Sequence, residues 1–233
     1  MAAAATTIAC KVSVLLSLFS VWFVCVSSDS LPNVGALPPT CQRIECPSYD
    51  LIQVGNGYEI RRYNSPVWIS NAPIQDISLV EATRTAFFRL FDYIQGKNNY
   101  KQKIEMTAPV ISEVSPSDGP FCESSFVVSF YVPKENQANP PTAKGLQVQR
   151  WKTVYVAVRQ FGGFVKDYDV GEQAAALKAS IAGTKWGAAV EKSKSAAHTS
   201  VYTVAQYNAP FEYDNRVNEI WFLFDIEDGQ QTM

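Results

Sequence analysis

Histidine is almost absent from this chain, whose 233 residues include only His198. Because histidine is the commonest general base and the usual activator of Ser or Cys nucleophiles, most such mechanisms and most metalloenzyme sites are excluded unless His198 itself takes part. A basic excess is also missing, since 20 Lys and Arg stand against 22 Asp and Glu, a formal charge of −2. Nothing is available to neutralise a row of phosphates, so no nucleic-acid partner is expected.

Long apolar runs are missing too, apart from one near the start, Val12–Val26. It is shorter than the roughly 20 residues that span a bilayer as a helix. Lys11 precedes it and Ser27-Ser28-Asp29 follow it, the order typical of a secretory signal peptide. We therefore expect residues 1–28 to be a leader cleaved near Ser28, with no stable membrane span afterwards. An uncleaved membrane anchor is the alternative, and the absence of Arg before Arg43 disfavours a plastid transit peptide.

Residues 29–45 form a Pro-rich arm that leads into the folded part of the chain. Cleavage of the leader would leave Cys41, Cys46 and Cys122. In an oxidising compartment Cys41 and Cys46 are expected to close a small disulfide loop, which leaves Cys122 without a partner. Two free thiols are the alternative, and zinc fits poorly because two thiols alone make an incomplete site.

The rest of the chain, residues 46–228, reads as one domain of two similar halves, about 46–140 and 141–228. Each half has the order strand, strand, helix, strand, strand. The expected strands are 58–63, 67–70, 106–114, 126–132, 146–151, 153–161, 201–207 and 219–225. A capping box of Ser78 and Glu81 starts the first helix and Gly96 ends it. Asp169 and Glu172 are expected to cap a second helix that runs to about residues 183–187.

Two offsets support a duplication: the expected helices begin 92 residues apart, at 79 and 171, and two Ala-Pro pairs lie 101 residues apart, at Pro109 and Pro210. Two such halves predict an α+β domain with internal pseudo-two-fold symmetry. Its architecture would be a distorted antiparallel β-barrel or curved sheet with two helices packed outside.

Phe88 is the residue that does not fit the first helix. A helical wheel gathers one broad apolar face, made of Leu79, Val80, Ala82, Ala86, Phe87, Leu90, Phe91 and Ile94. Phe88 falls among the polar residues of the opposite face.

The motif Lys103-Ile104-Glu105-Met106-Thr107-Ala108-Pro109-Val110, together with Tyr58–Tyr63 and Asn218-Glu219-Ile220-Trp221, resembles the SOUL haem-binding protein family. The resemblance extends from about Cys46 to Ile226, and a Cys-bearing arm after a secretory-type leader is similar to the plant-type members. It implies a barrel-like fold with an internal repeat that binds haem or another tetrapyrrole in a cleft beside the first helix. Some members have a His axial ligand there, but this chain has none at that place and His198 matches no such position.

The resemblance directs attention to Arg84, Phe88, Lys101, Lys103 and Met106 as cleft residues. Phe88 would stack on the macrocycle or is an ordinary exposed aromatic. Arg84, Lys101 and Lys103 would pair with propionates or are solvated surface charges. Met106 would offer a thioether to iron or fills a gap in the core.

The resemblance implies a non-catalytic carrier or buffer of tetrapyrroles. We expect a monomer, which the leader directs to the secretory pathway, either extracellular or vacuolar. His198 is expected to be a surface loop residue, with a distal ligand role as the alternative. An interaction module of the same fold with little haem affinity is the second hypothesis. An enzyme is the third, disfavoured by the scarcity of His and by Glu105 being a lone carboxylate in the motif.

Overall fold

The computed structural model describes residues 37–115, 123–196 and 201–226. The expected leader, residues 29–36 of the arm, Cys122 and His198 lie outside these residues. In the described part no helix is long and apolar enough to cross a membrane.

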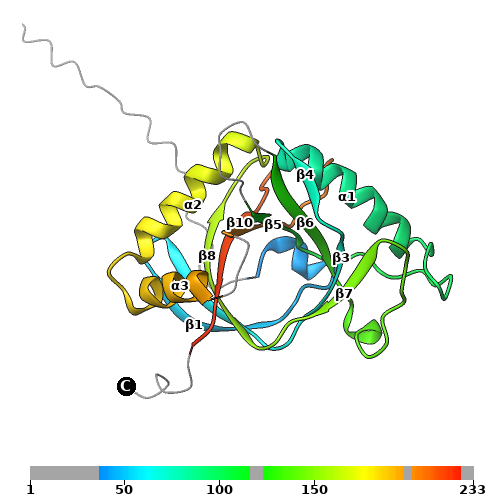
Figure 1. Cartoon of the computed structure of the whole chain (residues 1–233), viewed down its shortest axis with the longest axis horizontal. Helices are drawn as coiled ribbons and strands as arrows, with labels where there is room; N and C mark the ends of the chain where they lie inside the picture. The colour runs from blue at the N-terminus through cyan, green and yellow to red at the C-terminus, as the bar shows by residue number, and fades with distance from the viewer. Residues whose placement is uncertain (1–36, 116–122, 197–200, 227–233) are drawn as a thin grey trace, which may run out of the picture. The chain divides into compact units, whose positions relative to one another are not determined.

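Ten strands pair antiparallel in one sheet that curls into a half-barrel (Figure 1). The strands are β1 (Tyr49–Gly55), β2 (Tyr58–Tyr63), β3 (Val67–Asn71), β4 (Ile74–Asp76), β5 (Val110–Ser115), β6 (Ser124–Tyr131), β7 (Leu146–Arg150), β8 (Val154–Phe161), β9 (Tyr202–Gln206) and β10 (Asn218–Phe224). The helices are α1 (Leu79–Ile94), α2 (Asp167–Ile181) and α3 (Lys185–Ala196), with short 3-10 turns η1 (Pro39–Gln42) and η2 (Lys134–Asn136). The predicted α+β class and curled antiparallel sheet are confirmed.

The order of the strands reveals the internal repeat. It runs β1-β2-β8-β10-β9-β5-β6-β3-β7, with β4 on the side of β6. The first half supplies β2, β3, α1, β5 and β6, and the second supplies β7, β8, α2, β9 and β10 in the same sequence. The counterparts are β2 and β7, β3 and β8, β5 and β9, and β6 and β10. When each strand is replaced by its counterpart, the order from β2 to β7 becomes the same order in reverse. The sheet therefore has pseudo-two-fold symmetry about the β5–β9 pair, as predicted.

The two Ala-Pro pairs are not counterparts, and this part of the duplication argument is wrong. Ala108-Pro109, joined by a cis peptide bond, comes immediately before β5. Ala209-Pro210 instead follows β9, the counterpart of β5, in the loop that leads to β10. Strands β5 and β9 begin at residues 110 and 202, 92 residues apart, so the 101-residue offset compared two unrelated loops.

The helices cover one face of the sheet and aromatic side chains fill the other. Helix α1 lies against β3, β4, β5 and β6, while α2 lies against β2, β8 and β10, and α3 against β10. Because successive strand residues point to opposite faces, Ile220, Phe222 and Phe224 pack under α2 and α3, whereas Trp221 points the other way. That second face, here called the interior face, holds Tyr63, Trp68, Tyr131, Tyr207 and Trp221.

The helix starts meet where the two halves join. Ser78 Oγ accepts a hydrogen bond from Glu81 N at 3.1 Å, as the capping box predicts. Ser78 Oγ also donates to Asp167 Oδ2 at 2.8 Å, and Val80 N donates to Asp167 Oδ1 at 3.1 Å. The carboxylate in the first turn of α2 thus caps α1, where the helix dipole favours negative charge. At the other end Gly96 has a φ of 103°, as its role as a helix stop requires.

Several boundaries differ from those predicted from the sequence. Strands β1 and β4 were not expected, and β5 begins at residue 110 because the segment before it is irregular. The second helix begins at Asp167. Asp169, which was expected to cap the helix, therefore lies within its first turn. The helix ends at Ile181, close to the predicted end, and after a break at residues 182–184 the chain forms a third helix, α3, which was not expected.

Candidate functional site

Helix α1 carries an apolar stripe on its exposed side. The exposed fraction is 60% for Phe88, 39% for Phe91 and 37% for Val80. With Arg84 these residues recur about once per turn, so they line up along one side of the helix. Phe87 lies at the edge of the stripe, with its ring stacked on Phe91 at a centroid distance of 5.8 Å and an interplanar angle of 16°. We call Val80, Phe87, Phe88 and Phe91 the α1 platform.

The α1 platform packs on the sheet through Phe87, and it includes residues that the helical wheel had assigned to the buried face. Phe87 packs on Phe130 of β6 with ring centroids 5.3 Å apart, and Phe88 meets Phe87 edge-on at 6.1 Å. The wheel placed Val80 and Phe91 on the buried face, which is wrong, and it omitted Tyr93, which is buried. An apolar arc of eight residues is wider than a helix can bury against one sheet, so part of it had to face outward.

Lys101 and Lys103 lie just beyond the C-terminal end of α1, and both are exposed. Their segment is pinned to the helix by Asn98, whose Oδ1 accepts hydrogen bonds from Tyr100 N at 3.2 Å and Gln102 N at 3.1 Å. Lys101 itself has a φ of 52°, in the left-handed region that few non-glycine residues adopt. Neither ammonium group has an ion-pair partner among the described residues.

Arg84 and Met106 complete the predicted set and have different surroundings. Arg84 Nη1 lies 3.6 Å from Glu81 Oε2, and both side chains are well exposed. A pair of that kind stabilises little and leaves the guanidinium available to a ligand. Met106 is half-buried and packs against the core cluster that contains Ile94 and Val110. The helix therefore brings Arg84 and Phe88 together, and the lysines and Met106 follow its far end.

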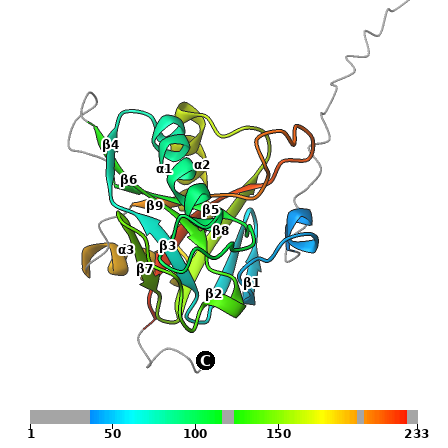
Figure 2. The same cartoon turned by 90° about the vertical axis from the view of Figure 1, so that its right-hand side faces the viewer.

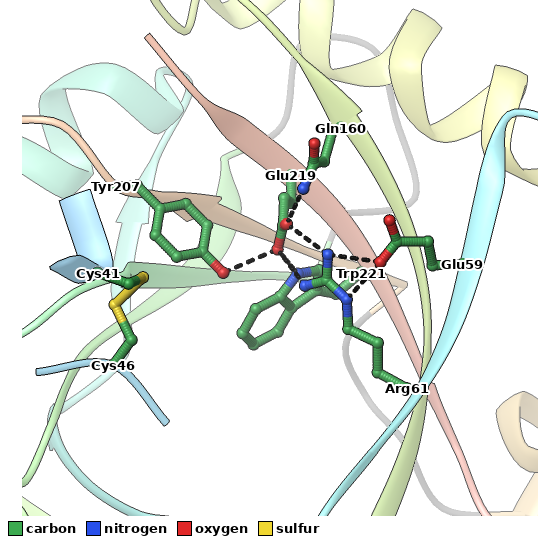
Figure 3. A network of polar contacts seen from close by, with 8 residues as sticks. All are labelled: Cys41, Cys46, Glu59, Arg61, Gln160, Tyr207, Glu219 and Trp221. Atoms are coloured by element: carbon green, nitrogen blue, oxygen red, sulfur yellow. Dashed lines mark hydrogen bonds and ion pairs between the residues drawn. A yellow bond between two sulfur atoms is a disulfide. The ribbon is translucent and has the colours of Figure 1, made fainter. Parts of the chain in front are cut away.

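A buried ionic network occupies the interior face (Figure 3). Arg61 is fully buried, and its Nη2 and Nη1 donate to Glu219 Oε1 and Oε2 at 2.9 and 3.1 Å. Its Nε donates to Glu59 Oε2 at 2.8 Å. Burial is the largest single influence and would lower the pKa of Arg61, but the Glu219 carboxylate and the nearby Tyr63, Tyr207 and Tyr49 together raise that pKa by more, so the guanidinium remains charged.

Three neutral donors complete the coordination of Glu219. Tyr207 Oη donates to its Oε2 at 2.9 Å, Trp221 Nε1 to the same oxygen at 2.7 Å, and Gln160 Nε2 to Oε1 at 3.0 Å. Burial, and then the Glu219 carboxylate, raise the pKa of Tyr207 well above its usual range. The phenol therefore stays protonated and serves as a fixed donor.

Aromatic rings pack closely around this network. Trp68 lies 5.3 Å from Trp151, 5.6 Å from Tyr131 and 6.5 Å from Trp221, measured between centroids. These are contact distances for aromatic pairs. A macrocycle inside the half-barrel would have to displace these packed rings.

The arm, coloured blue in Figure 2, forms a loop that is closed by a disulfide, which Figure 3 draws. Cys41 and Cys46 are bonded, as expected for an oxidising compartment. Between them, Glu45 O accepts a hydrogen bond from Ala108 N, and Glu45 Oε1 accepts one from Lys134 N, both at 3.0 Å. The disulfide loop thereby ties the motif before β5 to the segment after β6.

A hollow of about 430 Å³ lies between this disulfide loop and the β9–β10 loop, residues 207–217. It is lined by residues 39, 40 and 43 and by residues 208 and 211–215. Arg43 Nη2 binds Glu212 Oε1 across it, and this hydrogen bond lowers the pKa of the Glu212 carboxyl. None of the five predicted cleft residues lines the hollow.

The model of the family described as SOUL heme-binding protein matches residues 44–223. The chain belongs to the SOUL heme-binding protein family. Human Heme-binding protein 2 is 36% identical over 199 residues, which cover 82% of this chain and 92% of that protein. The mouse protein of the same name is 34% identical over 188 residues, covering 78% and 87%. Heme-binding protein 1 of Xenopus laevis is 29% identical over 171 residues, covering 72% and 84%.

Among solved structures, the C-terminal domain of EcmrR aligns over 75% of this SOUL chain and all of that domain, at 9% identity and a TM-score of 0.45. Across the described residues of this SOUL chain, no group of three or more His, Cys, Asp and Glu is arranged to hold a metal ion. No axial ligand for a haem iron is therefore assigned.

The sequence pattern singled out Phe88 as a candidate, but it indicated neither the other exposed residues of the platform nor the buried network. Phe87 and Phe91 were counted as core because a wheel gives no depth. Glu59 and Arg61 were read as ordinary polar positions of a strand that alternates. One feature of the sequence did indicate the network. Arg61 and Tyr63 lie two residues apart in a strand, so their side chains point to the same face, and a charged group had to share the buried face with an aromatic ring.

Proposed function

We propose that this SOUL protein binds haem or a related tetrapyrrole on the α1 platform and acts as a non-catalytic carrier or buffer. The observation that carries the proposal is the exposure of Phe88 on a rigid, well-packed helix. An isolated exposed aromatic is ordinary, but here two further exposed apolar residues and a stacked partner extend it into a continuous surface.

The platform suits a planar, largely apolar ligand. Aromatic rings stack on flat π systems, and each such contact contributes about 0.5–1.5 kcal/mol beyond the area that it buries. The rings of Phe87 and Phe91 already lie nearly parallel, with an angle of 16° between them. A ligand would therefore meet preorganised rings, which lowers the entropic cost of binding.

The charged side chains near the platform are cations, which can pair with the negatively charged propionates of a tetrapyrrole. Arg84 lies one turn before Phe88, and Lys101 and Lys103 follow the C-terminal end of the helix. Helix geometry places Arg84 about 15 Å from the end of α1, so cations flank the platform along its length. Charge-assisted hydrogen bonds from these side chains would orient the carboxylates.

The residues fit a ligand held by its faces and its propionates. Met106 packs into the core cluster beneath the helix, which favours gap-filling as its role over iron ligation. Haem, if bound, brings its own iron chemistry, and the residues of this chain supply stacking and charge. We accordingly propose that iron is not required for recognition.

Hemin titration of the purified protein tests the proposal. A saturable shift of the Soret band and quenching of Trp fluorescence are expected. Phe88→Ala should weaken binding about 2- to 13-fold, the loss of one aromatic contact, and leave the melting temperature unchanged because the side chain is exposed. Tyr168→Ala, a matched truncation of a 68% exposed aromatic on α2, should leave hemin affinity unaltered.

The two variants separate the possible outcomes. No saturable shift at micromolar protein would refute the carrier and leave an interaction module of the same fold. Equal weakening by Phe88→Ala and Tyr168→Ala would mean that hemin adsorbs non-specifically. A fall in melting temperature for Phe88→Ala would show that the residue belongs to the core.

We further propose that the protein enters the secretory pathway and functions there as a monomer. The Cys41–Cys46 disulfide supports this, because such bonds persist in oxidising compartments. The apolar run at residues 12–26 supports a cleaved leader. N-terminal sequencing of the mature protein should begin near residue 29, and an intact Met1 would refute cleavage.

A further inference from the structure

The β9–β10 loop carries exposed aromatic side chains that take part in no role assigned above. Phe211 is 76% exposed and Tyr213 is 73% exposed, and both line the hollow beside the disulfide loop. Exposed aromatic side chains gathered at a hollow are unusual on a soluble protein and mark binding sites. The α1 platform does not include them.

The loop backbone and the ring of Tyr213 are held in place. Arg216 is buried, and its Nη1 donates to the backbone oxygens of Ala209 at 2.7 Å and Glu212 at 2.6 Å. Its guanidinium also lies over the ring of Phe164, 4.2 Å from the centroid. Phe164 in turn meets Tyr213 edge-on, with centroids 5.8 Å apart. A buried cation thus fixes both the loop backbone and the orientation of Tyr213.

The opposite wall of the hollow is fixed as well. Glu212 accepts hydrogen bonds from Arg43 at Oε1 and from Ala209 N at Oε2, the latter at 2.9 Å. Arg43 belongs to the loop closed by the Cys41–Cys46 disulfide. Both walls are therefore organised before any ligand arrives, which lowers the entropic cost of binding.

The side chains that remain free are those that recognise hydroxyl groups. Asp214 has no ion-pair partner among the described residues and offers two acceptor oxygens. Asn215 adds an amide with donor and acceptor, and Arg43 has guanidinium N–H groups beyond the one given to Glu212. Vicinal hydroxyls pair with such planar groups, while the C–H face of a sugar ring packs on an aromatic ring.

We propose that this hollow is a second ligand site, which binds a neutral saccharide on Phe211 and Tyr213 with its hydroxyls held by Asp214, Asn215 and Arg43. A tetrapyrrole is disfavoured here because Glu212 and Asp214 would repel its propionates. An extended peptide is also disfavoured, since the loop carbonyls and amides that would pair with it are already used by Arg216 and Glu212.

Saturation-transfer NMR with three neutral tetrasaccharides, cellotetraose, maltotetraose and chitotetraose, tests the site. At least one should receive saturation at its ring C–H protons, with a dissociation constant below about 10 mM. Phe211→Ala and Tyr213→Ala should each weaken that binding about 2- to 13-fold, the worth of one aromatic contact. Both side chains are largely exposed, so the variants should fold normally.

Phe88→Ala is the matched control: it should leave saccharide binding intact, just as Tyr213→Ala should leave hemin binding intact. This separation also keeps the saccharide site independent of the proposed function. The inference is overturned if no tetrasaccharide binds at about 10 mM, or if Phe211→Ala and Tyr213→Ala bind as the parent does. It is likewise overturned if tetragalacturonate or tetralysine binds this hollow more tightly than every neutral probe.

Discussion

Replacement of Arg61 by Met should be the most destabilising single change in the buried network. It leaves the carboxylates of Glu59 and Glu219 on the interior face without their cation. Arg61 gives two hydrogen bonds to Glu219, at 2.9 and 3.1 Å, and its Nε gives one to Glu59 at 2.8 Å. All three residues are at most 5% exposed, so water cannot replace the lost partner.

Removal of one partner from a buried pair typically costs about 3–5 kcal/mol. That is a large part of the 5–15 kcal/mol that stabilises a typical domain. For a domain of this size, each kcal/mol lowers the melting temperature by about 2–4 °C, so a fall of about 6–20 °C is expected. Urea denaturation followed by Trp fluorescence measures the free energy directly.

Arg62→Met is the matched control, since the neighbouring Arg62 binds Asp50 at the surface, at 2.8 Å. An exposed pair of this kind contributes at most about 1 kcal/mol. In the Arg61→Met background, Glu219→Gln should restore part of the stability near neutral pH, because one uncompensated charge is removed. The reasoning is refuted if Arg61→Met costs no more than Arg62→Met, or if Glu219→Gln destabilises the Arg61→Met variant further.

Two further predictions concern a helix contact and a lone carboxylate. Gly187→Ala should destabilise the fold by about 1–3 kcal/mol in urea denaturation, because the added Cβ would lie 2.5 Å from Ile181 O. Gly171→Ala is the control: its Cβ would have no atom within 4 Å, so it should stabilise α2 by up to about 1 kcal/mol. Equal effects of the two substitutions would refute the contact. Burial raises the pKa of the Glu113 carboxyl in the folded state. Protonation of this carboxyl therefore favours the folded state, a contribution that is fully present below the unfolded pKa and is lost as pH rises through the folded pKa. Glu113→Gln should therefore raise the melting temperature more near pH 7 than near pH 4, unlike the exposed control Glu172→Gln, and an equal gain at both pH values would contradict this.

The sequence indicated the fold where the signals were local. Ser78 with Glu81 and Gly96 bounded the first helix because caps depend on neighbouring residues only. Short, β-branched and aromatic segments located eight of the ten strands. The repeat was also visible, although the Ala-Pro pairs that seemed to support it lie in unrelated loops. The identity of two dipeptides does not show whether each one comes before or after its strand.

Residue depth could not be read from a linear pattern. The wheel assigned Phe91 and Val80 to the core and left out Tyr93, because it gives the direction of a side chain and not what lies opposite. The third helix was not expected either, because the sequence after the break at residues 182–184 was not read as helical. Gly183, with a φ of 72°, and Thr184, whose Oγ1 accepts a hydrogen bond from Gly187 N, form the turn, and α3 then packs on β10.

The sequence by itself determined the family motif, the helix caps, the Cys pair and the lone Phe88 on a polar helix face, since each depends on residue type and short spacing. Tertiary structure alone decided which charges are buried together. Arg61 and Glu219 are 158 residues apart, yet they form two hydrogen bonds because β2 and β10 both pair with β8. It likewise decided that the interior face is filled by packed aromatic rings and that Phe88 belongs to an exposed apolar stripe on α1. Contacts between distant strands follow from the order of the sheet, and no local pattern encodes that order.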